Sequence, residues 1–390
     1  MIRTVKKQLG LAGKNPKLAW HKAKVTLMDE RIARRNFRQG HGYAKMPHVV
    51  AVRLTNLCNC KCKMCGQPRL GDEGIPKGFF RDHLTVDDWK HVIDQIAPSR
   101  PNFYLWGGEP MIYKGLYKVI RYAKQSGLTV QMNTNALLIP EHIDDIVESG
   151  LDDLIISLDG PEDVHDEIRG VPGLFQKITS GIRGIRDKQR ELNVKHPLIR
   201  IRGTINPANF DHLFELVKIT QELDGDSLSF NHFWFTSVKE GKRYEKIMKE
   251  VFDTEANSWQ GFVFEPKDLK LDALGAELEK FKCNTVDFPI TISPNLSAKD
   301  LQPYYNNLNE TFGAKDCYTI YFKTYLMPNG DVTPCPDFPD YIAGNLLQDS
   351  FADIWNGEKY RHFRRSLKTN GLLPICSRCC DLHVGNVAFY

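Results

Sequence analysis

The sequence predicts an α/β fold built on a parallel sheet, either a partial barrel or an open doubly wound sheet. From residue 49 onward, short apolar runs alternate with segments of helical periodicity, as in successive βαβ units. The chain has 390 residues, of which 42% are hydrophobic, so it can bury a sizeable core. No apolar run approaches the roughly 18 residues of a transmembrane helix, and the N-terminus lacks the apolar stretch of a secretory signal.

Six strands and five helices are expected in the first part of this pattern. The predicted strands are 49–55, 102–106, 128–133, 153–158, 198–204 and 227–235. The predicted helices are 86–97, 115–126, 141–149, 172–193 and 208–223. Both architectures place their functional loops at the carboxyl ends of the strands.

The βα period ends near residue 236. After it we expect helical structure over 237–282, an extended piece at 289–294, a hairpin over 320–334 and a helix over 351–368. The expected parts are therefore a basic, helical N-terminal segment (1–48), the barrel (49–236), a mostly helical connecting region (237–316) and a C-terminal region (317–390).

The net charge of +4 is unevenly distributed. Residues 1–40 hold eleven basic and two acidic residues, net +9, whereas the remainder carries −5. Leu18, Val25, Met28 and Ile32 stand near helical spacing, so residues 1–40 could form an amphipathic helix on an anionic membrane surface or against an acidic partner. The alternative is a solvated helix that caps one end of the barrel. No nucleic-acid partner is expected, because no motif for one is present.

Ten cysteines without a secretory signal favour a cytoplasmic protein in which clustered thiolates bind metal. The basic segment could bring such a protein to the inner face of the membrane. Cys58, Cys62 and Cys65 follow the first strand with the spacing C-x3-C-x2-C. Three thiolates can hold a [4Fe–4S] cluster and leave one iron open. The alternative is a four-cysteine zinc site that recruits Cys60 or a distant cysteine.

This loop resembles the signature of the radical S-adenosylmethionine (radical SAM) superfamily. The resemblance includes the bulky Met64 before the last cysteine, a position that packs near the adenine in that family. The segment Gly107-Gly108-Glu109-Pro110 is similar to the family's GGEP segment, which binds the methionyl amino group. Asn133 begins the Asn-Thr-Asn turn that stands where the family often has T-N-G.

The run Ser157-Leu158-Asp159-Gly160, with Arg169-Gly170 after it, resembles the SLDG…RG run of radical SAM enzymes that carry extra clusters. The resemblance implies that Ser157 and Arg169 contact the ribose or carboxylate of SAM, and that Asp159 belongs to the same cofactor site. Since each segment follows a predicted strand, all should converge on one rim of the barrel. Glu109 can pair with an ammonium group there.

A second cysteine set lies near the C-terminus and resembles the auxiliary-cluster domain called SPASM, or its shorter form, Twitch. The pattern C-x12-G-x4-C is followed by C-x2-C, but the next step of a full SPASM domain falls on Gly385. The resemblance implies one auxiliary [4Fe–4S] cluster, suited to electron transfer. Its expected ligands are Cys317, Cys335, Cys376 and Cys379. Cys380 could replace Cys379 as the fourth ligand. The alternative to an iron–sulfur cluster is a four-cysteine zinc ribbon. Cys283 is expected to be a buried small hydrophobe.

Arg200, Arg202 and Thr204 alternate along the fifth strand and so share one face. The arginines there form an internal ion pair, reach water from the strand end, or clamp a carboxylate or phosphate of the substrate or cofactor. Arg202, and His232 on the sixth strand, are the candidate catalytic residues.

The resemblance implies a partial (β/α)6 TIM-like barrel followed by a small α/β extension of Twitch or SPASM type. Its cofactors would be a SAM-binding [4Fe–4S] cluster, an auxiliary [4Fe–4S] cluster and SAM, with a reducing partner such as flavodoxin or ferredoxin. The expected activity is cleavage of SAM to a 5′-deoxyadenosyl radical, which takes hydrogen from a polar, anionic or sugar-like metabolite that is then oxidised or rearranged.

Two alternatives stay open at this point. A peptide maturase that cross-links, epimerises or oxidises its substrate is one, although the 48 residues before the first strand are too few for the leader-recognition domain that such enzymes often carry. A zinc-stabilised binding module without catalytic activity is the other.

Overall fold

The computed structural model describes residues 31–68, 72, 78–266, 268–283, 286–383 and 387–389. In this part of the chain, eleven strands form one sheet in the order β10-β9-β8-β1-β2-β3-β4-β5-β6-β7-β11. The strands are β1 (Val49–Arg53), β2 (Asn102–Trp106), β3 (Thr129–Thr134), β4 (Asp153–Ser157), β5 (Leu198–Ile205), β6 (Ser227–His232), β7 (Ile290–Ser293), β8 (Lys323–Leu326), β9 (Asp331–Thr333), β10 (Gly344–Asn345) and β11 (Ala388–Phe389).

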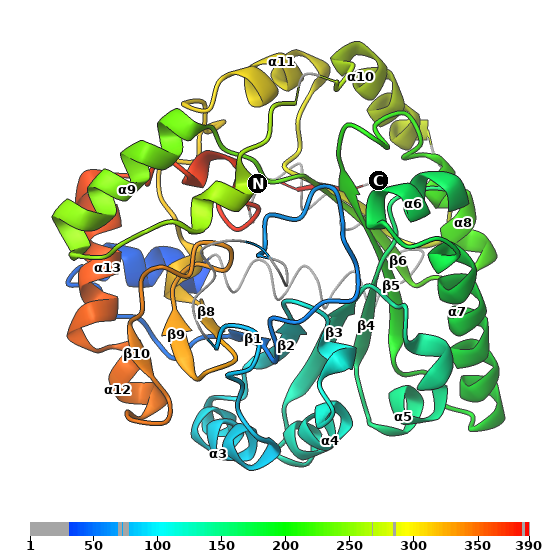
Figure 1. Ribbon diagram of the computed structural model, residues 1–390, viewed down its shortest axis with the longest axis horizontal. Coiled ribbons are helices and arrows are strands. Elements are labelled where there is room, and N and C mark those ends of the chain that lie inside the picture. Colours follow the sequence, from blue (N-terminus) through cyan, green and yellow to red (C-terminus); the bar gives the residue numbers. More distant parts are fainter. Residues whose placement is uncertain are drawn as a thin grey trace.

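The helices of the described residues cover the outer side of this sheet and its C-terminal end. They are α3 (Val86–Ile96), α4 (Leu116–Gln125), α5 (Ile143–Glu148), α6 (Glu162–Arg169), α7 (Leu174–Glu191), α8 (Glu215–Glu222), α9 (Val238–Phe252), α10 (Leu271–Lys280), α11 (Ala298–Asn306), α12 (Phe351–Trp355) and α13 (Glu358–Asn370). A further helix spans 31–39. Figure 1 shows β1 to β6 following an arc, with α3, α4, α5, α7 and α8 outside it.

The expected α/β fold with a partial barrel is confirmed. All neighbours from β8 through β1 to β7 are parallel, and the three remaining pairs, β8–β9, β9–β10 and β7–β11, are antiparallel. The sheet is an open barrel with helices on its outer side, so the doubly wound alternative is excluded. The six predicted strands agree with β1 to β6 to within three residues at each end.

Two parallel strands were not predicted as part of the barrel. β7 pairs with β6, and β8, from the predicted hairpin, pairs with β1 in the register Val49↔Lys323. The C-terminal region therefore extends the barrel sheet, and the expected part boundaries at 236 and 317 stay predictions. The predicted helix over 351–368 is two helices that break at Asn356 and Gly357, and α6 was missed.

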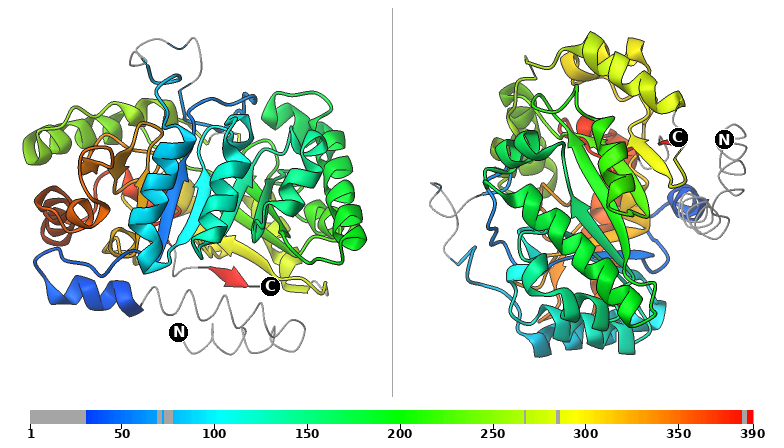
Figure 2. Two further views of the ribbon diagram at one scale, coloured as in Figure 1. Left: turned by 90° about the horizontal axis from the view of Figure 1, so that it is seen from below. Right: turned by 90° about the vertical axis from the view of Figure 1, so that its right-hand side faces the viewer.

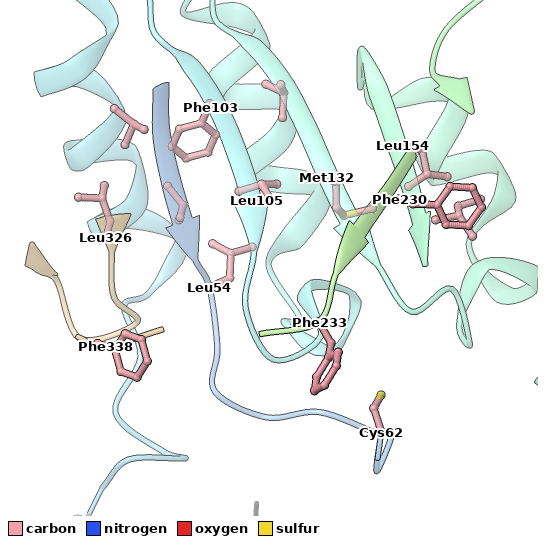
Figure 3. Close-up of a cluster of buried hydrophobic side chains, with 14 of the residues drawn as sticks. Leu54, Cys62, Phe103, Leu105, Met132, Leu154, Phe230, Phe233, Leu326 and Phe338 are labelled. Carbon is pink, nitrogen blue, oxygen red and sulfur yellow. The ribbon is translucent and has the colours of Figure 1, made fainter. Parts of the chain in front are cut away.

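The two faces of the sheet differ in polarity because alternate residues of a strand point to opposite sides. On β2, Phe103 and Leu105 are fully buried, whereas Tyr104 is only half-buried. Figure 3 shows Phe103, Leu105 and Met132 within the hydrophobic cluster on the helix side of the strands. The opposite, half-buried set of side chains forms what we call the inner face of the barrel.

The N-terminal segment is tied to the C-terminal helices. Figures 1 and 2 show helix 31–39 beside α13. Arg364 of α13 is fully buried and donates to the carbonyls of Ile320, Gly42 and Trp355 at 2.8–3.0 Å. Its guanidinium also stacks on the Trp355 ring, 4.0 Å from the centroid. Residues 1–30 lie outside the described residues, and within those described no helix is both long and apolar enough to cross a lipid bilayer.

Replacement of Arg364 by methionine should destabilise the fold by about 3 kcal/mol, because three buried carbonyls lose their donor. The matched control is Lys359→Met, at an exposed position of the same helix. Urea denaturation of both variants measures the difference. Equal stability of the two variants would show that Arg364 does not hold these segments together.

Candidate active site and iron–sulfur sites

The loop over residues 58–65 follows β1 and is anchored to two other segments of the barrel rim. The amide of Glu109, after β2, donates to the Leu57 carbonyl at 2.7 Å. The amides of Lys61 and Lys63 donate to carbonyls in the last turn of α6, at 3.1 and 2.8 Å. The predicted convergence of these segments on one rim is therefore present in the structure.

The thiols of Cys58, Cys62 and Cys65 lie close enough to influence one another. Cys62 is buried, and its pKa is lowered to about 6 by a hydrogen bond from the Cys60 thiol and by the Arg169 guanidinium, whose Nη1 lies 3.6 Å from Sγ. Burial raises the pKa of Cys58 to about 11, and the Cys62 and Cys65 thiolates add to the effect. A loop of neighbouring thiols, one already stabilised as a thiolate, fits the ligand set of an iron–sulfur cluster.

A single metal ion and a cluster need different spacings of their thiolate ligands. Among the described residues, no three His, Cys, Asp or Glu side chains lie close enough to hold one metal ion. A zinc site needs its sulfur ligands to converge on one ion at about 2.3 Å. A [4Fe–4S] cluster takes each thiolate on a separate iron, so its ligands stand further apart.

Two glycines let the segment after β2 pack closely on β1 and on the residues that lead from β1 into the cysteine loop. A Cβ on Gly107, whose φ is +92°, would lie 2.2 Å from Cγ of Arg53. A Cβ on Gly108 would lie 2.2 Å from the backbone carbonyl oxygen of Leu57. A side chain at Gly107 would displace the Arg53 side chain, and one at Gly108 would displace the backbone just before the cysteine loop.

The Glu109 carboxylate is 1% exposed and accepts three hydrogen bonds. Thr134 Oγ1 and the backbone N–H of Asn135 donate at 2.7 Å, and the backbone N–H of Met111 donates at 3.0 Å. Burial raises the pKa of Glu109, and these donors oppose the rise. Since a carboxylate offers about four acceptor positions, one remains, which fits the ammonium group of an amino acid. Asn135 also reaches the cysteine loop, with Nδ2 3.8 Å from Cys58 Sγ.

Asp159 and Arg169 form a buried ion pair behind the cysteine loop. Arg169 Nε donates to Asp159 Oδ2 at 2.6 Å, while the Thr204 amide donates to Oδ1 at 2.8 Å. Burial lowers the pKa of Arg169, but Asp159 and Cys62 outweigh it, so the guanidinium stays charged. Burial also lowers the pKa of His165 to about 4, and its neutral Nδ1 accepts from the Asp159 amide. Both Asp159 oxygens therefore have protein donors.

The thiols of the second cysteine set lie near one another in the C-terminal region. Burial raises the pKa of Cys317 to about 11 and that of Cys376 to about 12. Burial, together with the nearby Cys376 and Cys317 thiols, raises the pKa of Cys335. The hydrogen bond with Cys380 and burial raise the pKa of the Cys379 thiol, and the nearby Cys376 and Cys317 thiols add to the rise. Four thiols, each with at least two of the others nearby or sharing those neighbours, fit a fully ligated cluster, which would remove their cost of burial as separate charges.

The Cys380 thiol has charged neighbours that differ from those of the four expected ligands. A hydrogen bond from Cys379, with Lys323 and Arg202 nearby, lowers the pKa of the Cys380 thiol to about 6. Its neighbour Asp381 pairs with Lys323 at 3.1 Å and accepts from the Tyr325 hydroxyl. Since Lys323 and Arg202 project from barrel strands on opposite sides of β1, the end of the second cysteine set borders the inner face of the barrel.

The two arginines of β5 have different surroundings. Arg200 Nε pairs with Asp153 Oδ1 at 2.7 Å, so it is the internal ion pair that one alternative predicted. Arg202 donates to the Tyr104 hydroxyl at 3.3 Å and to Ser229 Oγ at 3.4 Å. No carboxylate of the described residues lies within ion-pair distance of Arg202.

Comparison with known families accounts for both cysteine sets. Residues 52–227 match the Radical SAM superfamily. Residues 317–380 match the SPASM iron–sulfur cluster-binding domain. The chain belongs to the radical SAM superfamily. It is an enzyme of that superfamily with a SPASM domain, and its cofactors are SAM, a SAM-binding [4Fe–4S] cluster and an auxiliary cluster, as the resemblance implied.

Three relatives illustrate the range of this group. An AdoMet-dependent heme synthase of Methanosarcina barkeri is 26% identical over 334 residues, covering 85% of this chain and 88% of the relative. The sporulation killing factor maturation protein SkfB of Bacillus subtilis is 24% identical, covering 79% and 65%. The crystal structure of Streptococcus suis SuiB bound to the precursor peptide SuiA superimposes with a TM-score of 0.60 at 17% identity, covering 95% and 76%. The family match excludes the zinc-stabilised binding module.

The remaining predicted residues of this radical SAM enzyme divide into two groups. Met64, Pro110, Asn133 and Ser157 lie on the rim or on the barrel strands leading to it, and their cofactor contacts stay predictions. His232 does not join them. It lies on the helix side of β6, where Nδ1 is 2.5 Å from the Tyr305 hydroxyl, and burial lowers its pKa to about 3. The alternation with the apolar Leu228 and Phe230 could have indicated this side.

Several charged residues of the inner face were missed. Arg53 is 4% exposed and reaches the Pro336 carbonyl at 3.5 Å, between the two cysteine sets. Lys323 and Asp381 form the ion pair beside Cys380. Arg53 and Lys323 lie on β1 and β8. These strands are short, so the alternation of side chains along the sequence does not show which face of the sheet each residue occupies.

Replacement of Gly108 by alanine should weaken SAM binding about tenfold or more, because the new Cβ displaces the Leu57 backbone, which leads into the cysteine loop. The control is Gly275→Ala, where the nearest atoms lie at an ordinary 3.6 Å. Equilibrium binding of SAM to the anaerobically reconstituted proteins gives both affinities. Wild-type affinity in Gly108→Ala would contradict the close packing of these segments.

The placement of Cys379 and Cys380 predicts that only the former holds the auxiliary cluster. Cys379→Ala should lose about four iron atoms per chain, whereas Cys380→Ala should keep them. Iron and sulfide analysis of the two reconstituted variants separates the cases. Loss of iron from Cys380→Ala with retention in Cys379→Ala would reverse the assignment.

Proposed function

We propose that this radical SAM enzyme oxidises an anionic metabolite that bears a carboxylate or phosphate and binds against the inner face of the barrel. The observation that carries the proposal is Arg202, which faces inward without a carboxylate partner among the described residues. A half-buried guanidinium that makes only two long hydrogen bonds to neutral groups leaves most of its five donors for a ligand. Planar, bidentate binding of carboxylate or phosphate suits such a group.

The surroundings of Arg202 support this assignment over a structural role. Arg200 lies two residues earlier on the same face and forms an ion pair with Asp153. Lys323 adds a second positive charge near Arg202, although Asp381 balances it in part. A ligand anion at Arg202 would therefore neutralise a charge that no carboxylate of the described part of the chain pairs with.

The proposed site borders the end of the second cysteine set, because Arg202 lies near Cys380. When bound, SAM and its cluster supply a 5′-deoxyadenosyl radical that takes hydrogen from carbon, and a fully ligated auxiliary cluster can take up an electron. Glu109 would hold the amino group of SAM at the rim, and Arg202 would hold the substrate anion below it. Arg169 would keep the cysteine loop in place. An oxidation by two electrons, such as a dehydrogenation, suits this order of groups.

Similarity to SkfB supports a second candidate, a radical SAM peptide maturase. In that case Arg202 would bind a side-chain carboxylate of the peptide. The heme synthase relative covers more of both chains and supports the metabolite instead. Either enzyme needs a low-potential reductant such as flavodoxin or ferredoxin.

The test measures 5′-deoxyadenosine formed by the anaerobic, dithionite-reduced enzyme above its rate without substrate. Low-molecular-mass extract of the source cells, fractionated on an anion exchanger, provides the substrate pool. The retained, protease-resistant fraction should stimulate the wild type. In Arg202→Gln the kcat/KM for that fraction should fall about 30- to 100-fold, the loss of one charged contact of 2–3 kcal/mol, while the rate without substrate stays unchanged.

The opposite pattern identifies the alternatives. Stimulation that a protease abolishes would favour the peptide maturase. Stimulation by the unretained fraction, equal in wild type and Arg202→Gln, would contradict an anionic substrate at this residue.

A further inference from the structure

One strongly basic surface of the described chain is not used by the proposed reaction. Residues 31–45 contain five basic residues and no acidic one. On helix 31–39, Arg34, Arg35 and Arg38 are exposed on one side. On α13, Arg361, Arg365 and Lys368 follow at helical spacing. We call these six residues the basic face.

The two helices form one continuous surface. Lys368 Nζ donates to the Phe37 carbonyl at 2.6 Å, and Arg361 Nε donates to the His41 carbonyl at 3.1 Å. The acidic residue of α13, Glu358, is paired with Arg365 and Arg361. The face therefore presents an excess of positive charge over a surface two helices wide.

This surface lies directly over the second cysteine set. The Phe37 ring contacts the ring of Tyr318, the residue after Cys317, at 5.2 Å between centroids. On the buried side of α13, Tyr360 lies close enough to Cys335 and Cys317 for their thiolates to raise its pKa in addition to burial. One helix, about 10–12 Å thick with its side chains, thus separates the auxiliary site from the basic face.

We propose that the basic face docks an acidic one-electron carrier protein of the ferredoxin or flavodoxin class, which exchanges electrons with the auxiliary site. The inference rests on the proposed function, because an oxidation needs an acceptor. The substrate loses a hydrogen atom to the 5′-deoxyadenosyl radical, and then one electron and one proton. The oxidised carrier takes up that electron and becomes one-electron reduced, while the proton passes to solvent.

The contacts of helix 31–39 favour a protein over an anionic membrane. A helix that lies on a membrane buries an apolar face among the lipids. Here Ala33 and Asn36 are buried, Asn36 donates to the Tyr321 carbonyl, and Phe37 packs on Tyr318. The apolar side of the described helix is occupied by the protein itself, and its outer side is charged. Charge complementarity without apolar insertion is typical of transient protein complexes.

The test compares the reconstituted full-length enzyme with the charge-reversal variant Arg35→Glu/Arg38→Glu. The matched control is Lys177→Glu/Arg183→Glu, two exposed positions on α7. Isothermal titration with an oxidised flavodoxin of net negative charge gives the affinity at low and at moderate ionic strength. Stopped-flow spectroscopy follows electron transfer from the dithionite-reduced, desalted enzyme to the flavodoxin.

The proposal predicts that wild type and control bind flavodoxin equally, with affinity that falls as salt rises. The variant should bind at least tenfold more weakly at low salt and transfer electrons correspondingly more slowly. Its iron content and its dithionite-driven 5′-deoxyadenosine formation should equal those of wild type. Equal flavodoxin binding by wild type and variant would overturn the docking site.

A second arm tests the membrane. Co-sedimentation with phosphatidylserine vesicles should not distinguish variant from wild type. If the variant loses vesicle binding and keeps flavodoxin binding, the basic face binds membranes and the proposal is wrong. Failure of the proposed oxidation would be seen separately, as no substrate-stimulated 5′-deoxyadenosine with dithionite while flavodoxin still binds.

Discussion

The buried pair of Arg169 and Asp159 is the interaction on which the arrangement of the active site depends. Arg169 joins the end of α6 to the cysteine loop, since its backbone carbonyl accepts from Lys61 and its guanidinium lies against Cys62. Asp159 joins the same guanidinium to β5 through the Thr204 amide. Removing either partner would leave a charge without its counterion in a dry interior. Three barrel segments are thereby fixed around the site predicted to hold SAM.

The inner face connects this rim with the C-terminal cysteines because both belong to one sheet. β8 adds to β1, so the SPASM residues after it sit beside the strand that leads into the first cysteine loop. Arg53 lies between the two sets, and Asp381 reaches back to Lys323 on the inner face. A substrate held at Arg202 would face groups from both halves of the protein. The single sheet therefore brings residues of both halves of the protein to the inner face of the barrel.

Most of the barrel could be predicted, since apolar strands and amphipathic helices have local periods. The pairing of β8 with β1 could not, because it joins residues more than 270 positions apart and no local pattern encodes it. The site was predictable where motifs carry it, as at Glu109. Arg200 and Arg202 have identical patterns, and only the neighbour Asp153 separates the ion pair from the unpaired charge. His232 shows the opposite case. The alternation along β6 indicates that it lies on the helix side, whereas its polar side chain suggested a place in the active site.

The most direct test of the account is electron paramagnetic resonance of the reduced, anaerobically reconstituted enzyme, with iron analysis of the same sample. The account predicts about eight iron atoms per chain, from two [4Fe–4S] clusters. Addition of SAM should change the signal of one cluster, the one with an open iron, and leave the other unchanged. Stoichiometric zinc in place of iron, or a signal that SAM does not alter, would contradict it.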